Sequence, residues 1–394
     1  MPLANDPTTA IRDAVAAIEA ELIAVRRDIH AHPELAFEEV RTAALVAREL
    51  AKLGIPHRTG VAKTGVVGLI EGPRPGRVLI IRADMDALPI QEATALPWAS
   101  QVPGRMHACG HDIHTTILLG VAAVLKDLAP RIAGTVKLVF QPAEEAIGGM
   151  KQMLAEGLLE DPKVDLALGF HNGPELPAGR FAYIRGPAMA AADPFEVVLH
   201  GVSGHAAAPH TAIDPIVAAA YLITQLQTVV SREVNPMHPA VVTVGAIHGG
   251  EAVNIIPDSV TFIGTVRTLH APARDTAEAA IRRLCEGAAA TLRVRPEVTY
   301  TRGTPPLVND DRLLEPAVAA VRRQLGDVIA EAAPVMGAED LSYLFERVPG
   351  YWLRIGSGAP GRADRLHNSG YAPDEACIGL GVQAVCRAAL DLLS

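Results

Sequence analysis

Apolar residues follow two patterns in the first half of the sequence. At residues 11–29 and 42–53 they recur with helical spacing, and His32-Pro33 should end the first of these helices. A continuous apolar stretch at residues 117–125 predicts a buried helix. Four shorter apolar runs are typical of buried strands, at residues 66–70, 77–81, 135–140 and 164–170. Strands that alternate with helices predict an α/β domain whose strand ends gather on one edge of a sheet.

The pattern changes after residues 186–194, whose composition we interpret as a linker. The elements predicted beyond it follow the order strand, helix, strand, strand, helix, strand, at residues 195–200, 214–230, 240–247, 259–267, 273–292 and 295–301. This βαββαβ order is that of a ferredoxin-like domain. We therefore predict that residues 193–303 are inserted into a discontinuous domain of residues 1–192 and 304–394. That domain resumes with helices and one strand at residues 311–325, 340–347, 351–355 and 375–393.

Composition and charge exclude several classes of protein. The chain has 394 residues, of which 49% are hydrophobic and 20% charged, so it can bury the cores of two domains. A net charge of −9 argues against a nucleic-acid partner, and the apolar stretches are too short to span a bilayer. The first seven residues do not resemble a signal peptide, and four cysteines are too few for a disulfide framework. We therefore predict a cytoplasmic protein that acts on neither nucleic acids nor membranes.

Three histidines, one cysteine and one aspartate fall within residues 107–114, directly before the apolar helix. Asp112 stands where the helix N-cap is expected, which would leave Cys109 and His111 in the preceding loop. Residues two apart in an extended loop point to the same side, and thiolate and imidazole are the ligands that zinc prefers. Taken alone, the pair could equally be a buried thiol and a structural histidine.

Further polar residues follow the predicted strands. They are Asp84 and Asp86 after the second strand, Glu144 and Glu145 after the third, and His171 after the fourth. Ligands collect where the strands of an open α/β sheet end. Adjacent residues in an extended segment face opposite ways, so one glutamate can bind a metal while its neighbour acts as a base. For Asp84, a capped turn is an equally good interpretation.

Nine motifs in the same order along nearly the whole chain suggest a family. They are RDIHAHPE (27–34), RADMDALP (82–89), HACGHD (107–112), QPAEE (141–145), GHAA (204–207), AVNIIP (252–257), GTVR (264–267), GAED (337–340) and LHN (366–368). Together they resemble the M20 family of metal-dependent peptidases and amidohydrolases. Within it, the chain is most similar to the N-acyl-amino-acid amidohydrolases, which include hippurate hydrolases and plant hormone-conjugate hydrolases.

The resemblance implies a dinuclear metal centre, with zinc, manganese, cobalt or nickel as the two divalent ions. Its five ligands would be Cys109, His111, Glu145, His171 and His367. The cysteine would serve as a ligand where other branches of the family have a bridging aspartate. The general base falls on Glu144, and Asp86 matches an acid near the metals. Because Asp84 stands where related branches have histidine, the role of Asp86 stays open.

In the predicted inserted domain, the resemblance implies three residues that act on the substrate. His205 would act on the reaction intermediate, often from the partner subunit of a dimer, and Arg267 and Asn254 would bind the substrate. A guanidinium is well suited to grip a carboxylate. Taken alone, His205 could be a surface residue of a loop, Arg267 a member of a structural ion pair, and Asn254 a turn residue. We expect this domain to be a lid that brings all three onto the substrate. It should also pair with its copy in a homodimer or homotetramer, because a small sheet leaves an edge strand to cover.

The predicted activity is metal-dependent hydrolysis of the amide bond of N-acyl-amino acids, as in aminoacylases and hippurate hydrolases. A dipeptidase of short peptides or an N-acetyl-amino-acid deacetylase of the same fold is the alternative. A non-catalytic metal-binding protein is a third interpretation, and the presence of Glu144 and all five candidate ligands argues against it. A cysteine hydrolase with Cys109 as nucleophile is a fourth, which a chelator should distinguish by sparing it. Residue spacing does not identify the acyl group.

Overall fold

A computed structural model describes residues 7–146 and 148–393. The described residues form two compact units. The large unit comprises the chain up to residue 186, residues 308–333 and residues from 343 onward, and the small unit comprises residues 187–307 and 334–342. Residues 187–192, 304–307 and 334–342 thus group with the small unit, whereas the prediction placed them in the discontinuous domain. None of the helices in the described ranges is both long enough and apolar enough to cross a membrane.

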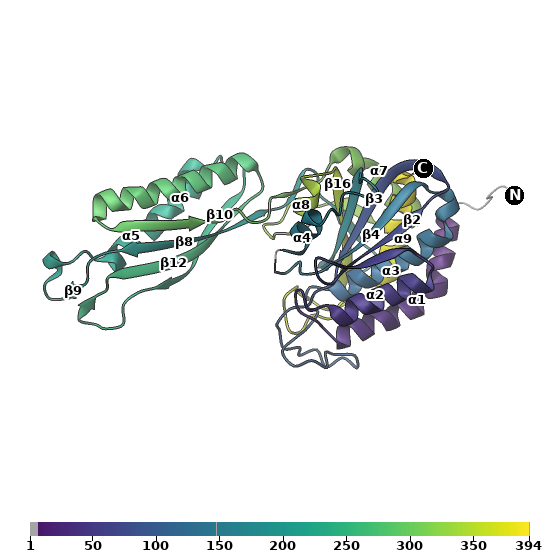
Figure 1. Cartoon of the computed structure of the whole chain (residues 1–394), viewed down its shortest axis with the longest axis horizontal. Coiled ribbons are helices and arrows are strands. Elements are labelled where there is room, and N and C mark those ends of the chain that lie inside the picture. The colour runs from purple at the N-terminus through teal and green to yellow at the C-terminus, as the bar shows by residue number, and fades with distance from the viewer. Residues whose placement is uncertain (1–6, 147, 394) are drawn as a thin grey trace. The chain divides into compact units, whose positions relative to one another are not determined.

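The large unit is built on an eight-stranded sheet with the order β1-β2-β4-β3-β5-β16-β6-β15 (Figure 1). Its strands are β1 (His57–Val61), β2 (Gly65–Glu71), β3 (Arg74–Asp84), β4 (Ala133–Gln141), β5 (Leu166–Pro177), β6 (Phe181–Tyr183), β15 (Ile329–Glu331) and β16 (Gly350–Gly358). The four neighbours β4, β3, β5 and β16 are parallel, whereas β1, β2 and β6 introduce antiparallel pairs. The sheet is therefore mixed, and its parallel strands point their carboxyl ends to one edge. The predicted α/β class is confirmed.

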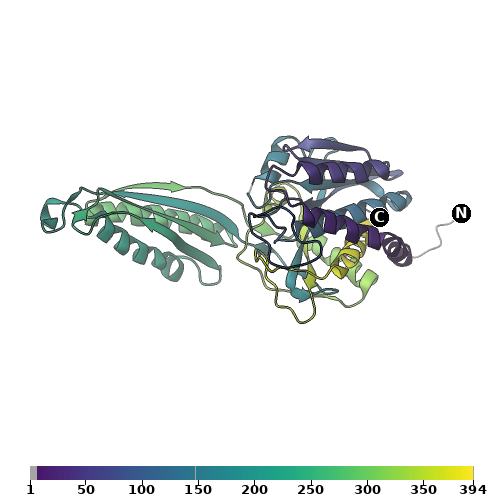
Figure 2. The same ribbon diagram turned by 90° about the horizontal axis from the view of Figure 1, so that it is seen from below.

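Helices of the large unit pack against this sheet and against one another. They are α1 (Pro7–Ala31), α2 (Val40–Lys52), α3 (His111–Asp127), α4 (Gly149–Ala155), α7 (Asp311–Leu325) and α9 (Ala376–Leu392), with the 3-10 turn η1 (Ala129–Arg131). The apolar α3 contacts β3, α1 and α9, and the yellow α9 lies beside the purple α1 (Figure 2). Ile117, Leu118 and Val121 of α3 are fully buried in the core. A helix with such a long apolar stretch is stable here because other elements surround it.

The small unit contains a four-stranded antiparallel sheet with the order β10-β12-β8-β13 and two helices on one face (Figure 1). Its main elements are β8 (Ala191–His200), α5 (Pro215–Thr228), β10 (Ala240–His248), β12 (Ser259–Thr268), α6 (Ala271–Leu292) and β13 (Arg295–Tyr300). This is the βαββαβ order expected from the sequence. Phe195, Val197 and Leu199 alternate along β8 to face α5 and α6, because successive side chains of a strand point to opposite faces.

Shorter elements complete the described chain. They are β7 (Pro187–Met189), β9 (Gly204–His205), η2 (Pro209–Thr211), η3 (Val229–Glu233), β11 (Ile255–Ile256), β14 (Leu307–Val308) and α8 (Ser342–Phe345). Two predictions were therefore wrong. Residues 186–194 are not a linker, since they contain β7 and the start of β8. The helix predicted at residues 340–347 is only the four-residue α8.

The N-cap predicted at Asp112 was also wrong. The helix α3 begins at His111, and its N-cap is Gly110, which has a left-handed backbone with φ of 88°. Asp112 lies in the first turn and is fully buried. Its carboxylate pairs with Arg26 Nε and accepts a hydrogen bond from His30 Nδ1, both at 2.8 Å. The charge of the buried guanidinium, and not the helix end, therefore determines where this carboxylate points.

Candidate metal and catalytic site

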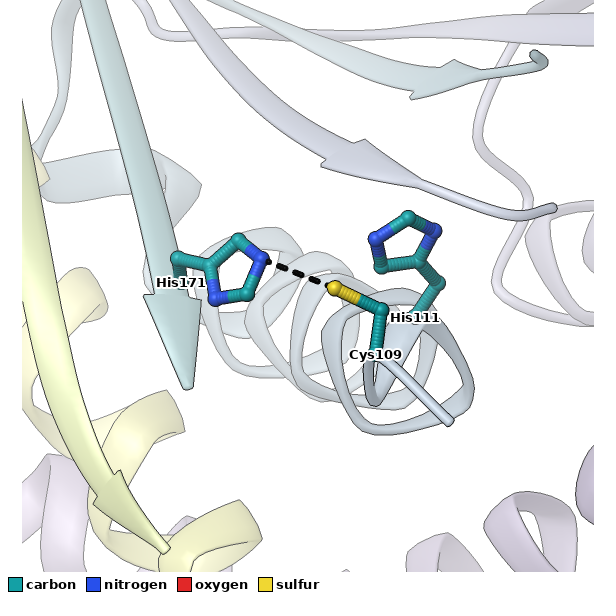
Figure 3. A group of neighbouring side chains, drawn as sticks. All are labelled: Cys109, His111 and His171. Atoms are coloured by element: carbon teal, nitrogen blue, oxygen red, sulfur yellow. Dashed lines mark hydrogen bonds between the residues drawn. The ribbon is translucent and has the colours of Figure 1, made fainter. Parts of the chain in front are cut away.

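Cys109 and His111 flank the glycine at the start of α3 and face His171 of β5. The sulfur of Cys109 lies 3.4 Å from His171 Nε2, and His111 lies beside the pair (Figure 3). One potential ligand atom from each of the three lies within 4.8 Å of the others. The prediction assumed an extended loop, but the left-handed turn at Gly110 brings the two side chains together. The sequence pattern placed His171 directly after a strand, but β5 continues beyond it, so His171 lies inside the strand.

A second group of potential ligands shares Cys109 with the first. The ligand atoms of Cys109, Glu145 and His367 also lie within 4.8 Å of one another, as do those of His111, Glu144 and Glu145. His367 Nε2 is 3.2 Å from Glu145 Oε1. The main-chain N–H of His367 donates to the carbonyl of Ala108 at 2.8 Å, which ties this late segment to the turn that carries Cys109. All five predicted ligands thus come together in the large unit, around the sulfur of Cys109.

Asp86 connects the two glutamates to His111. Its carboxylate accepts hydrogen bonds from the main-chain N–H of Glu144 at 3.1 Å and of Glu145 at 3.0 Å. The same carboxylate is 3.2 Å from His111 Nδ1 and is nearly inaccessible to solvent. Asp86 therefore sets the position of both glutamates and the orientation of the His111 ring, which leaves the Nε2 atom to face the cluster.

Two further residues, His114 and Asn172, were not predicted to belong to the site but contact it from the buried side. His114 Nδ1 is 2.5 Å from Asp84 Oδ1, and Asp84 also accepts from Arg82 Nη1 at 2.7 Å. His114 Nε2 faces Asn172, which follows the candidate ligand His171 in β5. One signal for His114 was available, since it lies three residues after His111 and so on the same side of a helix. Nothing in the sequence pattern distinguishes Asn172 from an ordinary strand residue.

The electrostatics of the cluster depend on burial. Burial raises the pKa of the Cys109 thiol, so a nearby positive charge is needed for it to ionise at neutral pH. Burial and the neighbouring His114 hold the pKa of His171 well below its ordinary value, which keeps this imidazole neutral. Hydrogen bonds with Cys109 and Glu145 raise the pKa of His367 to about 10. Burial lowers the pKa of His111, but the negative charge of Asp84 acts against it, and the pKa stands well above its ordinary value.

These groups fit a divalent metal. His111 Nε2 is buried and has no hydrogen-bond partner among the described residues, the nearest acid being Asp84 Oδ2 at 3.7 Å. A buried nitrogen without a partner is costly unless a metal or water satisfies it. One thiol, three imidazoles and one carboxylate are a donor set suited to zinc and similar transition metals. A dication would also supply the charge that the buried thiol needs in order to ionise.

The three residues predicted to act on the substrate lie in the small unit. His205 is exposed in β9, where it pairs with Ile255, and Asn254 directly precedes that partner strand. The carbonyl of Asn254 accepts from the N–H of Ala206 at 3.0 Å, so His205 and Asn254 are neighbours. Both lie at the end of the sheet where β12 begins with Ser259.

Arg267 lies at the other end of the same sheet. It is half-buried near the end of β12, opposite Ala192 of β8. Eight residue steps separate Ser259 from Arg267, which at the usual rise per residue is about 26 Å. The small unit of one chain therefore does not bring Arg267 together with His205 and Asn254. Their predicted contact with a substrate at the cluster stays a prediction.

Comparisons with known proteins agree on one family. Residues 80–391 match peptidase family M20/M25/M40. The chain is 40% identical over 361 residues to an N-acetyl-L-cysteine deacetylase of Bacillus subtilis, an alignment that covers 92% of this chain and 85% of that protein. It is 42% identical over 340 residues to the IAA-amino acid hydrolase ILR1-like 2 of Arabidopsis thaliana, covering 85% and 76% of the two chains.

The fold also resembles that of a solved structure. The Bacillus subtilis YXEP protein is described as a dinuclear metal binding peptidase from the M20 family. It superimposes with a TM-score of 0.86 at 37% identity, over 96% of this chain and 99% of that one.

Proposed function

The chain belongs to peptidase family M20, and from this premise we propose that it hydrolyses the amide bond of N-acyl-amino acids with two divalent metal ions. The products are a carboxylic acid and a free amino acid. The observation that carries the proposal is the grouping of Cys109, His111, Glu145, His171 and His367 around one sulfur, with Glu144 beside them. Relatives named as deacetylases and hydrolases of acylated amino acids support the same chemistry.

The five grouped side chains would hold the ions, and Cys109 belongs to both groups of potential ligands. Two divalent ions bound there would acidify a water molecule and polarise the acyl carbonyl. Zinc, manganese, cobalt and nickel all suit a site of mixed thiolate, imidazole and carboxylate donors. The other requirements of amide hydrolysis, which are proton transfer and the binding of the substrate, fall to the chain's own residues.

Glu144 is the proposed general base. Its main-chain N–H is held by Asp86, and its carboxylate can reach the same space as His111 and Glu145. From there it takes a proton from the attacking water and passes it to the leaving amine, a role that contributes about 10²–10⁴-fold to the rate. Asp86 is a positioning residue in this proposal, because it contacts Glu144 and Glu145 through their backbone and His111 through its ring.

Substrate binding is assigned to the small unit, acting as a lid in a homodimer or homotetramer. Arg267 would grip the α-carboxylate of the substrate with two parallel hydrogen bonds. Because His205 and Asn254 lie at the opposite end of the sheet from Arg267, we propose that the partner subunit supplies these two residues to each site. The proposed substrate is thus a small molecule with a free α-carboxylate, and the net charge of −9 argues against a nucleic-acid partner. The four cysteines are free thiols, which supports a reducing, cytoplasmic location.

A second candidate is the deacetylation of N-acetyl-amino acids, which the name of the Bacillus subtilis relative favours. One screen distinguishes the candidates: N-acetyl-, N-benzoyl- and long-chain acyl-amino acids and dipeptides, each assayed with zinc or manganese. Activity restricted to the acetyl compounds identifies a deacetylase, and activity on dipeptides alone identifies a dipeptidase. Turnover of none of these substrates with any of the metals would contradict the proposal.

Two controls accompany the screen. The first is the amide of each amino acid in place of the acid, which should be cleaved poorly if a carboxylate is gripped. The second is chelated protein, which should be inactive. A cysteine hydrolase would keep its activity there, but burial raises the pKa of Cys109 and so disfavours the thiolate that such an enzyme needs.

A further inference from the structure

Asn172 of β5 contacts α3, the turn before it, β16 and the loop of Tyr371 through one buried amide. The residue follows His171 in β5 and is completely inaccessible to solvent. Its Nδ2 donates to the carbonyl of Cys109 at 2.6 Å and lies 2.9 Å from His114 Nε2. Its Oδ1 accepts from Ser357 Oγ at 3.0 Å and from the hydroxyl of Tyr371. Every hydrogen-bonding position of the amide is therefore used.

The contact with His114 determines where that ring carries its proton. Both the main-chain N–H and the Nδ2 of Asn172 face His114 Nε2, each at 2.9 Å. Two donors require a lone pair on Nε2, so the proton is on Nδ1 and is donated to Asp84. Both ring nitrogens of His114 are thus hydrogen-bonded, to Asp84 and to Asn172, so His114 is not available as a metal ligand.

The contact with Cys109 has a direct consequence for the candidate ligands. The backbone of Asn172 continues from His171, and its side chain holds the backbone of Cys109. One amide group therefore links the backbones of these two candidate ligands, whose Sγ and Nε2 atoms lie 3.4 Å apart. Gly110 is adapted to the same contact, because a Cβ atom there would lie 2.3 Å from Asn172 Nδ2. Its left-handed backbone excludes most other residues as well.

We propose that Asn172 is a positioning residue of the metal centre, which sets the separation of Cys109 and His171 before a metal binds. The inference rests on the proposed metal-dependent function. Residues that orient metal ligands from behind typically change metal affinity by about 10–100-fold when they are replaced. A role confined to packing would instead lower the stability of the fold and leave the affinity for metal unchanged.

The chain offers a matched control in Asn309. This second buried asparagine of the large unit also bridges backbone groups, donating to the carbonyl of Ile184 and accepting from the N–H of Trp352, both at 2.7 Å. Neither of its partners is a candidate ligand. Replacing it tests what the loss of a buried amide does when that amide holds the backbone of no candidate ligand.

The experiment compares Asn172→Asp with Asn309→Asp in the full-length protein. The carboxylate in Asn172→Asp matches the amide in shape but presents oxygen, and not N–H, to the carbonyl of Cys109 and to His114 Nε2. Zinc affinity is measured by competition with a chromophoric chelator, and the thermal midpoint is measured on metal-free protein. We expect zinc binding to weaken at least about tenfold in Asn172→Asp and to stay at the wild-type value in Asn309→Asp. Both variants should lose thermal stability.

A second variant, Asn172→Ser, removes the donors without adding a charge and serves if Asn172→Asp does not fold. It should show the same selective loss of zinc affinity. Wild-type affinity in a folded Asn172 variant would overturn the proposal, as would an equal loss in Asn309→Asp. The wild type separates this result from a failure of the proposed function. If wild type binds no metal, the function fails, whereas two bound ions with unaltered binding in the Asn172 variants refute only the positioning role.

Discussion

The two units of this protein present their candidate functional residues in opposite ways. In the large unit, five potential ligands from distant segments meet in one cluster, and buried neighbours such as Asp86 and Asn172 hold them. In the small unit, His205 and Asn254 are exposed on a two-stranded extension, and Arg267 lies at the far end of the sheet. One chain therefore brings all five predicted metal ligands together but does not bring Arg267 together with His205 and Asn254. Metal binding should be a property of the single chain, and substrate binding should require a second one.

The largest effect is expected from Cys109→Ala, because both groups of ligands share this sulfur. The variant should lose bound metal and all measurable activity while it keeps its fold, since the core of the large unit does not depend on this side chain. Elemental analysis measures the metal content, and circular dichroism measures whether the fold is kept. Cys386→Ala, which replaces a buried thiol of α9 outside the cluster, is the control and should keep its metal. Full metal content in Cys109→Ala would show that the ligands are assigned wrongly.

The next largest effect is expected from Glu144→Gln. This change keeps the size of the side chain but removes the proposed base, so the rate should fall by about 10²–10⁴-fold with both ions still bound. The measurement is kcat together with metal content. Glu160→Gln, at an exposed glutamate of the same unit, should behave like the wild type. If Glu144→Gln turns over at a near-normal rate, Glu144 has no part in proton transfer.

A smaller loss is expected from His205→Ala and Arg267→Ala, each of which should lower kcat/KM without changing metal content. A mixture of the two variant proteins tests directly whether one site takes these residues from two subunits. In a symmetric dimer of one variant with the other, one of the two sites regains both residues if they come from different subunits. Random mixing should then restore about a quarter of wild-type activity. If the mixture is no more active than its components, His205 and Arg267 serve the same site from one chain, and the two-subunit account is wrong.

The smallest effect on activity is expected from Asp193→Asn in the small unit. Asp193 is fully buried and pairs with Arg274 through two hydrogen bonds of 2.6 and 2.8 Å. Removing one charge of a buried pair costs about 3–5 kcal/mol of unfolding free energy, because the other charge is left uncompensated. Thermal unfolding should show this loss, and zinc affinity should not change. A parallel loss of zinc affinity would mean that the metal cluster depends on the small unit.

Hydrophobic periodicity predicted most of this fold but not its polar parts. The helix expected at residues 311–325 is α7 with the same bounds, because one apolar stripe faces the core. The strand β1 was missed because four of its five residues are exposed and it has no apolar run. Asp112 was misassigned because a cap and a buried ion pair look alike in sequence, and only the tertiary position of Arg26 distinguishes them.

The candidate site was predicted unevenly for a related reason. Cys109, His111, Glu144 and Glu145 stand out because chemically reactive residues cluster within short segments. Asn172 and His114 do not stand out, since their function depends on hydrogen bonds to residues that are distant in sequence. Candidate ligands that cluster within a short segment are thus visible in a single sequence. An isolated one such as His367 was assigned only through the family resemblance, and the residues that position the ligands require the fold.

The most direct test of the account is a metal titration of the chelated protein. Bound zinc or manganese and the hydrolysis of an N-acyl-amino acid are followed together as metal is added. The account predicts that activity is absent without metal and reaches its plateau when two ions are bound per chain. Hydrolysis by fully metal-free protein, or a plateau reached with no ion bound to the Cys109 cluster, would contradict it.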